Sequence, residues 1–157
     1  MLAVKVILLF VLGLIFYQDI KERQVYWFLF PLVAICVGVL FFFKTLSELF
    51  IMAIALNILF VAILLLAVLL YTKIKLKSNK AIGLGDVLFF LASAFAFSTI
   101  SFIVIFIGSL IFSLVLHNAL TKSQNTITVP LAGYMSLFFG LTYLAYWFGI
   151  IQSVYQV

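Results

Sequence analysis

Charged residues are scarce in this chain, and their scarcity excludes most soluble folds. Of its 157 residues, 8% are charged and 68% are hydrophobic. A soluble globular domain carries about 25% charged residues, because its surface has to be solvated. The composition therefore predicts an all-α integral membrane protein. The length suits a single membrane-embedded domain over residues 1–157, with no separate soluble domain.

Cysteine and histidine are also rare, which excludes several kinds of chemistry. The one cysteine, Cys36, lies in an apolar run, so no internal disulfide and no cysteine-based metal site can form. The one histidine, His117, has no serine and acid placed with it as a catalytic triad would require. We therefore expect neither a metal nor any other cofactor.

Apolar runs long enough to cross a membrane are abundant. A helix that crosses the hydrocarbon needs about 20 mostly apolar residues. We predict six such helices in one bundle, at residues 2–18, 26–43, 49–71, 85–97, 101–120 and 127–150. The fourth and fifth come from one uncharged run, which as a single helix would be about 51 Å long. The cluster FSTIS at 97–101 is the expected turn between them.

The first apolar run, MLAVKVILLFVLGLIFYQ, has the length of a signal peptide as well as of a membrane span. No small-x-small cleavage site follows it, and it ends in Tyr17, Gln18 and Asp19. We therefore expect it to be a retained first helix.

Basic residues gather in three of the predicted loops and indicate the orientation in the membrane. The loops after the first, third and fifth helices hold Lys21, Arg23, Lys73, Lys75, Lys77, Lys80 and Lys122, whereas the opposite side holds Lys5 and Lys44. The positive-inside rule then places the basic loops in the cytoplasm and both termini outside. Contact with anionic lipid accounts for the net charge of +5 without any nucleic acid.

Only two aspartates are present, Asp19 and Asp86, and the predicted topology puts both at the cytoplasmic boundary. An aspartate costs about 2.5–3.5 kcal/mol at the centre of a membrane helix and less near the interface. Each has an ordinary explanation. Asp86 could cap the start of the fourth helix, and Asp19 could be a solvated acid at the end of the first.

As a pair, the two aspartates also fit a hydrolytic site. Two carboxylates around one water cannot both ionise easily, so one keeps a proton. The ionised carboxylate then takes a proton from water while the protonated one polarises the scissile carbonyl. Gly83 and Gly85 frame Asp86 and would let a peptide strand or another helix approach closely. The alternative is that these glycines only loosen a turn.

Three short motifs, taken in order, resemble those of a known family. GLGDVLFF looks like the G-x-G-D motif of the intramembrane aspartyl peptidases, and the layout is most similar to the type IV prepilin peptidases. YQDIKERQVYWFLF resembles the family's first aspartate, which closes a helix before a basic stretch. TVPLAGYMSLFFG looks like a degraded form of the proline–glycine element that opens the family's last helix, with Pro130 and Gly133.

The resemblance implies an aspartic-type endopeptidase in which Asp19 and Asp86 are catalytic and Gly83 and Gly85 support them. Its partner would be a pilin-like precursor, cleaved after a short basic leader at the cytoplasmic face of a bacterial or archaeal plasma membrane. The candidates for contact with this substrate are Lys21, Arg23, Pro130 and Gly133.

Two departures from the family pattern bear on activity. The isoleucine–proline–asparagine that often follows the first arginine is replaced here by VYW at 25–27. The extra domain with paired CxxC motifs is absent, so the chain resembles the compact peptidase-only form, and N-methyltransferase activity is doubtful.

Two other classes of function stay open. A small proton-coupled carrier would use the aspartates as proton sites. Such carriers commonly have duplicated halves and acids near mid-membrane, and the sequence has neither feature. A non-catalytic assembly subunit would use the aspartates only as helix caps. The sequence does not determine the oligomeric state.

Overall fold

The computed structural model describes residues 1–76, 83–120, 130–152 and 154–155. These residues form six α-helices and a short π-helix, Thr72–Leu76, and they contain no strand. The α-helices are α1 (Leu2–Glu22), α2 (Leu29–Phe42), α3 (Ser47–Tyr71), α4 (Leu84–Ser93), α5 (Thr99–Leu120) and α6 (Leu131–Trp147). Each predicted helix has a counterpart, and the all-α fold class is confirmed.

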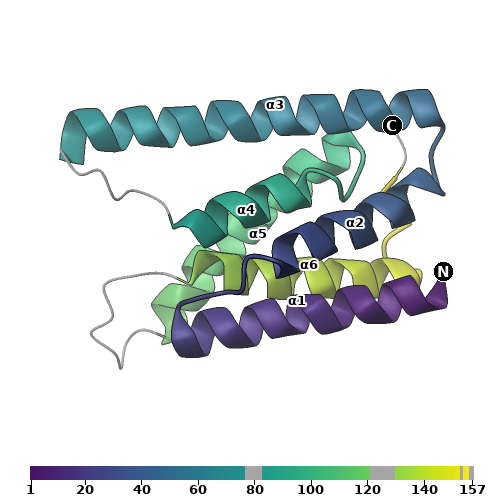
Figure 1. Ribbon diagram of the computed structural model, residues 1–157, viewed down its shortest axis with the longest axis horizontal. Coiled ribbons are helices and arrows are strands. Elements are labelled where there is room, and N and C mark those ends of the chain that lie inside the picture. Colours follow the sequence, from purple (N-terminus) through teal and green to yellow (C-terminus); the bar gives the residue numbers. More distant parts are fainter. Residues whose placement is uncertain (77–82, 121–129, 153, 156–157) are drawn as a thin grey trace.

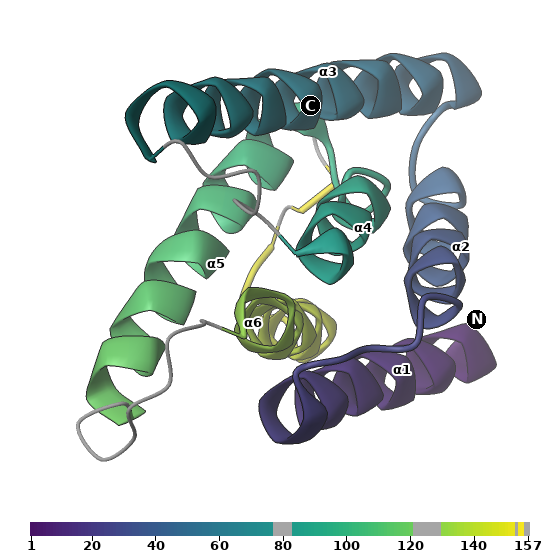
Figure 2. The same ribbon diagram turned by 60° about the vertical axis from the view of Figure 1, so that its left-hand side comes forward.

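The helices pack into one bundle in which α6, the last helix, lies against α1, the first. α1 lies beside α6 along most of its length, and α2 packs against both α1 and α4 (Figure 1). α5 packs against α6, and α3 lies across α4 and α5 (Figure 2). The chain thereby brings α1, α4 and α6 together, although they are far apart in sequence.

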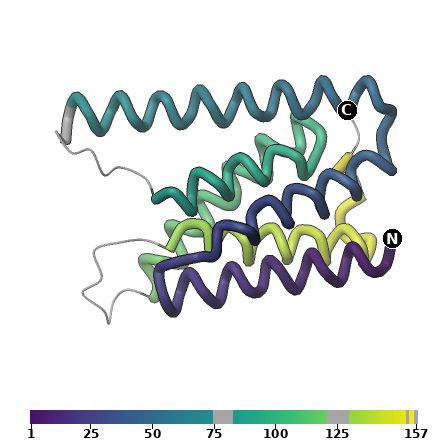
Figure 3. The backbone as a smooth tube through the Cα atoms, in the orientation of Figure 1, coloured from purple at the N-terminus to yellow at the C-terminus, as the bar shows by residue number. Residues whose placement is uncertain are grey.

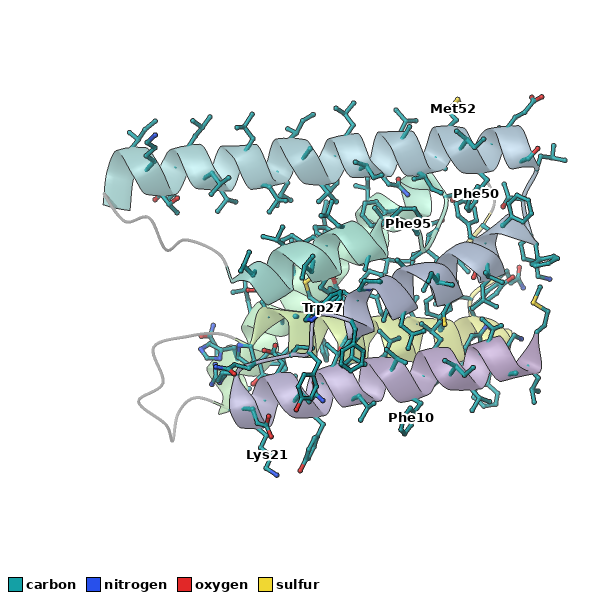
Figure 4. All side chains as sticks on the ribbon, viewed as in Figure 1. Phe10, Lys21, Trp27, Phe50, Met52 and Phe95 are labelled. Atoms are coloured by element: carbon teal, nitrogen blue, oxygen red, sulfur yellow. The ribbon has the colours of Figure 1, made fainter. Side chains whose placement is uncertain are left out.

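Three helical segments are long and apolar enough to cross a membrane. They are Leu2–Glu22, Ser47–Ile74 and Thr99–Leu120. Large apolar side chains such as Phe10 and Met52 are exposed on these helices and point away from the bundle (Figure 4). Such side chains are suited to contact with lipid. α2, with 14 residues, and α4, with 10, are shorter apolar helices. The structure thus supports a membrane-embedded protein.

The helix ends differ from the predicted ones mainly near the two aspartates. α1 continues to Glu22, so Asp19 lies inside the helix, and Arg23 ends it in the left-handed conformation with φ 55°. α2 begins only at Leu29, and the segment 23–28 runs back along α1 before it (Figure 3). The late start leaves an irregular segment where a helix was expected from residue 26.

The remaining ends show smaller differences. α4 stops at Ser93, and residues 94–98 form the turn into α5, which overlaps the FSTIS cluster expected to hold it. α3 begins at Ser47, two residues before the predicted start. α6 begins at Leu131 after Pro130 and ends at Trp147, while the predicted start at 127 lies outside the described residues.

The basic residues that the structure describes separate as the charge count predicted. Lys21 lies in the last turn of α1 and Lys73 follows α3, and these two helices end at the same end of the bundle (Figure 1). Lys5 lies near the start of α1 and Lys44 lies in the turn between α2 and α3, both at the opposite end of the bundle. Lys77, Lys80, Lys122 and the side chain of Lys75 lie outside the described part.

Aromatic rings fill the centre of the bundle and close its far end. The ring of Phe97 is fully buried and stacks on that of Tyr143, with ring centroids 5.0 Å apart. Beyond α6 the chain folds back, so Tyr155 stacks on Phe41 at 5.5 Å between centroids. This packing fixes the end of the bundle opposite to the aspartates.

A polar side chain, Asn57, connects α3 to the turn between α4 and α5. Its Nδ2 donates hydrogen bonds to the carbonyl oxygens of Ala94 and Phe97, both at 3.0 Å. Asn57 is fully buried. This is expected for an asparagine in the middle of an apolar helix whose side chain forms hydrogen bonds to neighbouring segments. The bonds hold the turn that separates the two halves of the long uncharged run.

Replacement of Asn57 by leucine should lower the free energy of unfolding by about 1 kcal/mol, because two buried carbonyls lose a donor. The matched control is Asn118→Leu at the exposed end of α5, expected to change stability by less than about 0.5 kcal/mol. Reversible unfolding in detergent micelles measures both. Equal stability of the two variants would contradict the bridging role of Asn57.

Candidate active site

Asp19 lies in the last turns of α1 and is held by the backbone of α6. Its Oδ2 accepts a hydrogen bond from the Gly133 amide, with 2.6 Å between the heavy atoms. Only 9% of its surface is exposed. The ordinary interpretation of Asp19 as a solvated acid at a helix end is therefore wrong, because the side chain faces the neighbouring helix and not water.

Asp86 lies in the first turn of α4 and reaches the same helix. Its Oδ1 accepts a hydrogen bond from the Ala132 amide at 2.9 Å. It is not the N-cap of α4, which is Gly83, although the backbone of Gly83 also bonds to the Asp86 carboxylate. The simple N-cap interpretation of Asp86 is therefore incomplete, since its carboxylate also bonds to another helix.

The two carboxylates meet at neighbouring residues of the chain, Ala132 and Gly133. The first amides of a helix have no partner within the helix, and α6 has no side-chain cap of its own. Carboxylates from α1 and α4 fill these positions, where the positive end of the helix dipole favours negative charge. Asp19 is close enough to Asp86 for their charges to interact.

The glycine that the geometry requires most is Gly133, and not the pair that frames Asp86. A Cβ on Gly133 would lie 2.9 Å from Asp19 Cβ, a distance that real Cβ contacts almost never show, and 3.0 Å from Oδ2, which is also unusually tight. A Cβ on Gly83 would lie 3.2 Å from Asp86 Oδ2, and one on Gly85 an ordinary 3.7 Å from Phe30. Close approach of α1 to α6 therefore depends on the missing side chain of Gly133.

The other predicted substrate contacts differ in how they face the site. Pro130 is buried and accepts a hydrogen bond from the Tyr134 amide at the start of α6. Lys21 is exposed, points away from the bundle and donates to the Tyr17 hydroxyl at 2.8 Å (Figure 4). Arg23 ends α1 close enough for its charge to attract the Asp19 carboxylate. Of the two cations, Arg23 is the one whose charge acts on the site.

This arrangement can hold two carboxylates in a fixed relation to one another. One oxygen of each carboxylate accepts a hydrogen bond from an amide of α6. The second oxygen of each carboxylate takes no part in that bond. Among the described residues, no group of three or more histidine, cysteine, aspartate or glutamate side chains could hold a metal ion. Two carboxyl groups at neighbouring positions are able to accept and donate protons.

The sequence did not point to Ala132 as a contact of the acid pair. Its amide is a backbone donor, and only the spatial meeting of α4 with α6 makes it a partner for Asp86. The signal available was Pro130, since a proline near the start of an apolar run marks a helix beginning with free amides.

Comparisons with protein-family models, curated proteins and solved structures gave no match to this chain. The case for a function therefore rests on the residues themselves. The features that bear on it are the buried pair of acids, the helix start that binds them, and the basic residues at the same end.

Replacement of Gly133 by alanine should destabilise the protein by about 1–3 kcal/mol, because the new methyl group and Asp19 cannot occupy the same space. The matched control is Gly140→Ala on the same helix, where the nearest side-chain atom, Leu12 Cδ1, lies 4.0 Å away. That variant should be neutral or more stable by up to about 1 kcal/mol, as alanine favours helix. If both variants unfold alike in detergent, the close approach of α1 to α6 is refuted.

Proposed function

We propose that this chain is a membrane aspartic-type endopeptidase that hydrolyses a peptide bond with Asp19, Asp86 and one water. The observation that carries the proposal is that the chain's only two aspartates bond to adjacent amides of one helix. Acids are costly in an apolar bundle, and a pair held side by side is poised to share a proton.

In the proposed reaction, the ionised carboxylate takes a proton from water as the water oxygen attacks the scissile carbonyl carbon. The protonated carboxyl gives its proton to the carbonyl oxygen, which forms a tetrahedral gem-diol. A proton then passes to the amide nitrogen, the C–N bond breaks, and a carboxylic acid and an amine leave. The hydrogen bonds from the amides of α6 would hold the two carboxylates in position through these steps.

The proposed substrate is a type IV pilin-like precursor, because the three motifs resemble those of the prepilin peptidases. Cleavage would follow a short basic leader at the cytoplasmic face of the membrane. The chain corresponds to the compact form of that family, so it would release the leader without N-methylating the product. Lipid is the only other partner the proposal needs.

We also propose that all six helices traverse the membrane, with the aspartates on the cytoplasmic side and both termini outside. The separation of Lys21 and Lys73 from Lys5 and Lys44 to opposite ends of the bundle supports this orientation. Non-helical backbone lies next to the short helices α2 and α4. Such backbone is tolerated within a membrane where the rest of the protein covers it or where it lines a water-filled cavity.

A structural role is the second candidate, because the aspartates do cap α6 in place of a local side chain. A non-catalytic assembly subunit would need only these caps. The proton-coupled carrier has less support, since both acids lie at one end of the bundle and not at its middle.

Replacement of either aspartate by asparagine separates catalysis from capping. The asparagine carbonyl still accepts the α6 amide, but it cannot exchange a proton. We expect Asp19→Asn and Asp86→Asn to lower the rate of precursor cleavage by about 10²–10⁴-fold or more. Cleavage is measured with purified protein in detergent or in vesicles that hold a pilin-like precursor.

The matched control is Glu48→Gln, an exposed acid in the first turn of α3 at the other end of the bundle. It should cleave at the rate of the unaltered protein. Membrane insertion and thermal unfolding show whether the asparagine variants fold. Cleavage that continues unchanged in a correctly inserted Asp86→Asn protein would reject the peptidase and favour the capping role.

The orientation is tested by labelling single cysteines after Cys36→Ala removes the native thiol. Lys44→Cys should react with a membrane-impermeant maleimide in intact cells, because it lies on the outer side. Lys21→Cys should react only after the membrane is permeabilised. Both side chains are exposed, so access to solvent is matched. The reverse labelling pattern would place the acid pair outside.

A further inference from the structure

Three consecutive aromatic residues, Tyr26, Trp27 and Phe28, lie exposed in the connection between α1 and α2. Their exposed fractions are 59%, 72% and 52%. The rings of Tyr26 and Phe28 stack on each other, with 5.6 Å between their centroids. We call residues 26–28 the aromatic segment. The bundle leaves this aromatic surface open to its surroundings, and large exposed apolar surface usually marks a site of contact.

The aromatic segment begins at the level of the acid pair along the bundle. The Tyr26 amide donates a hydrogen bond to Gln18 Oε1 at 3.3 Å, and Gln18 directly precedes Asp19 in α1. Asp19 and Asp86 accept hydrogen bonds from adjacent amides of α6, so both acids share this level. The chain doubles back beyond the end of α1 at Glu22 to reach it (Figure 3).

The backbone of the segment restricts which part of a membrane can surround it. Residues 23–28 are not helical, and the three aromatic residues are more than half exposed, so neighbouring helices do not cover them. Irregular backbone that faces lipid does not occur within the hydrocarbon, because its amides and carbonyls would lack partners there. In an embedded bundle the segment therefore lies outside the hydrocarbon, in the headgroup layer or in water.

The side chains favour the headgroup layer over bulk water. Tyrosine and tryptophan gather in this layer because the ring is apolar while the hydroxyl or indole N–H reaches polar groups. Beside the segment, Lys21 donates to the Tyr17 hydroxyl at 2.8 Å and lies 5.1 Å from the centre of the Tyr17 ring. The exposed cations Lys21 and Arg23 outnumber the exposed Glu22, and an excess of positive charge attracts anionic lipid.

We propose that the aromatic segment is the surface through which the bundle contacts the headgroup layer, and that this contact holds Asp19 and Asp86 at headgroup level. A phospholipid is the occupant because the segment is bonded to α1, whose exposed apolar side chains, such as Phe10, are suited to lipid. The same membrane surrounds both. The inference rests on the membrane-embedded fold and goes beyond the peptidase by stating the depth of the acids.

The lengths of the first two helices agree with this depth. If the hydrocarbon ends where the segment meets α1, residues 2–17 of the helix span about 24 Å of it. α2 begins directly after the segment, and its 14 residues reach about 21 Å. The two neighbouring helices thus give nearly the same thickness. A hydrocarbon layer that reached the end of α1 at Glu22 would enclose the exposed, non-helical segment.

The depth of Trp27 in a bilayer tests the proposal directly. The chain has two tryptophans, so Trp147→Phe leaves Trp27 as the only one. The protein is placed in vesicles of phosphatidylcholine and phosphatidylglycerol that carry either a nitroxide on the headgroup or bromines near the ends of the acyl chains. Contact with the headgroup layer predicts strong quenching of Trp27 fluorescence by the nitroxide and weak quenching by the bromines.

The matched control is Phe10→Trp in a protein that also carries Trp27→Phe and Trp147→Phe. Phe10 is 67% exposed and lies near the middle of α1. The ratio of nitroxide to bromine quenching should be about 2- to 5-fold higher for Trp27 than for Phe10→Trp, because only Trp27 lies at the interface.

A third reporter, Ile20→Trp in the same background, measures the level of the acids. Ile20 is exposed, directly follows Asp19 and lies about 15 Å from Phe10 along the helix. Its quenching ratio should match that of Trp27. A ratio that matches Phe10→Trp would reject headgroup level for the acid pair.

Two other results would overturn the contact itself. Equal ratios for Trp27 and Phe10→Trp would place the segment in the hydrocarbon. A Trp27 that neither lipid probe quenches would show that water, a protein partner or a second copy of the chain surrounds it. Trp27 is native, so its own two quenching values decide the contact even if an introduced tryptophan prevents insertion.

The outcomes are separate from those of the peptidase. The depth measurements need no substrate, so they stand even if no precursor is cleaved. Cleavage that requires both aspartates, together with a Trp27 that the headgroup probe does not reach, would reject the lipid contact and leave the peptidase standing.

Discussion

The fold depends on the hydrogen bonds that the start of α6 gives to the carboxylates of Asp19 and Asp86. In an apolar bundle, free helix amides and isolated carboxylates are each costly, because nothing replaces the water that would otherwise solvate them. When the amides of α6 donate to the carboxylates, neither group stays unpaired and both costs are removed. It also fixes where α1 and α4 meet α6, so three helices from distant parts of the sequence share one anchor.

In the proposed peptidase, the same contacts that stabilise α6 would also orient the two acids for proton transfer. A carboxylate fixed by one oxygen keeps a defined direction for the other, and proton transfer needs such a fixed geometry. The negative charges of the two carboxylates repel each other, which disfavours ionisation of both at once. A structural cap and a proton-transfer site therefore place compatible demands on these residues.

The helices, the turn near FSTIS and the location of both aspartates at one end were predictable from composition and spacing. The partners of the aspartates were not, since Ala132 and Gly133 offer only backbone groups whose use depends on packing between helices. The positions of Gly83 and Gly85 beside Asp86 predicted a supporting role for them, whereas the steric demand is greatest at Gly133. The late start of α2 was also unpredictable, because the aromatic residues 26–28 continue directly into the apolar run of the helix.

The short helices α2 and α4 have a consequence for the lipid around the protein. At about 1.5 Å per residue, their 14 and 10 residues reach about 21 Å and 15 Å, less than the hydrocarbon thickness of about 30 Å. The 25 residues of α3 exceed it. Such unequal lengths favour a local depression of the leaflet on the side where α4 begins. Solvent would then reach the acids below the average surface, and host membranes with longer acyl chains would restrict that access.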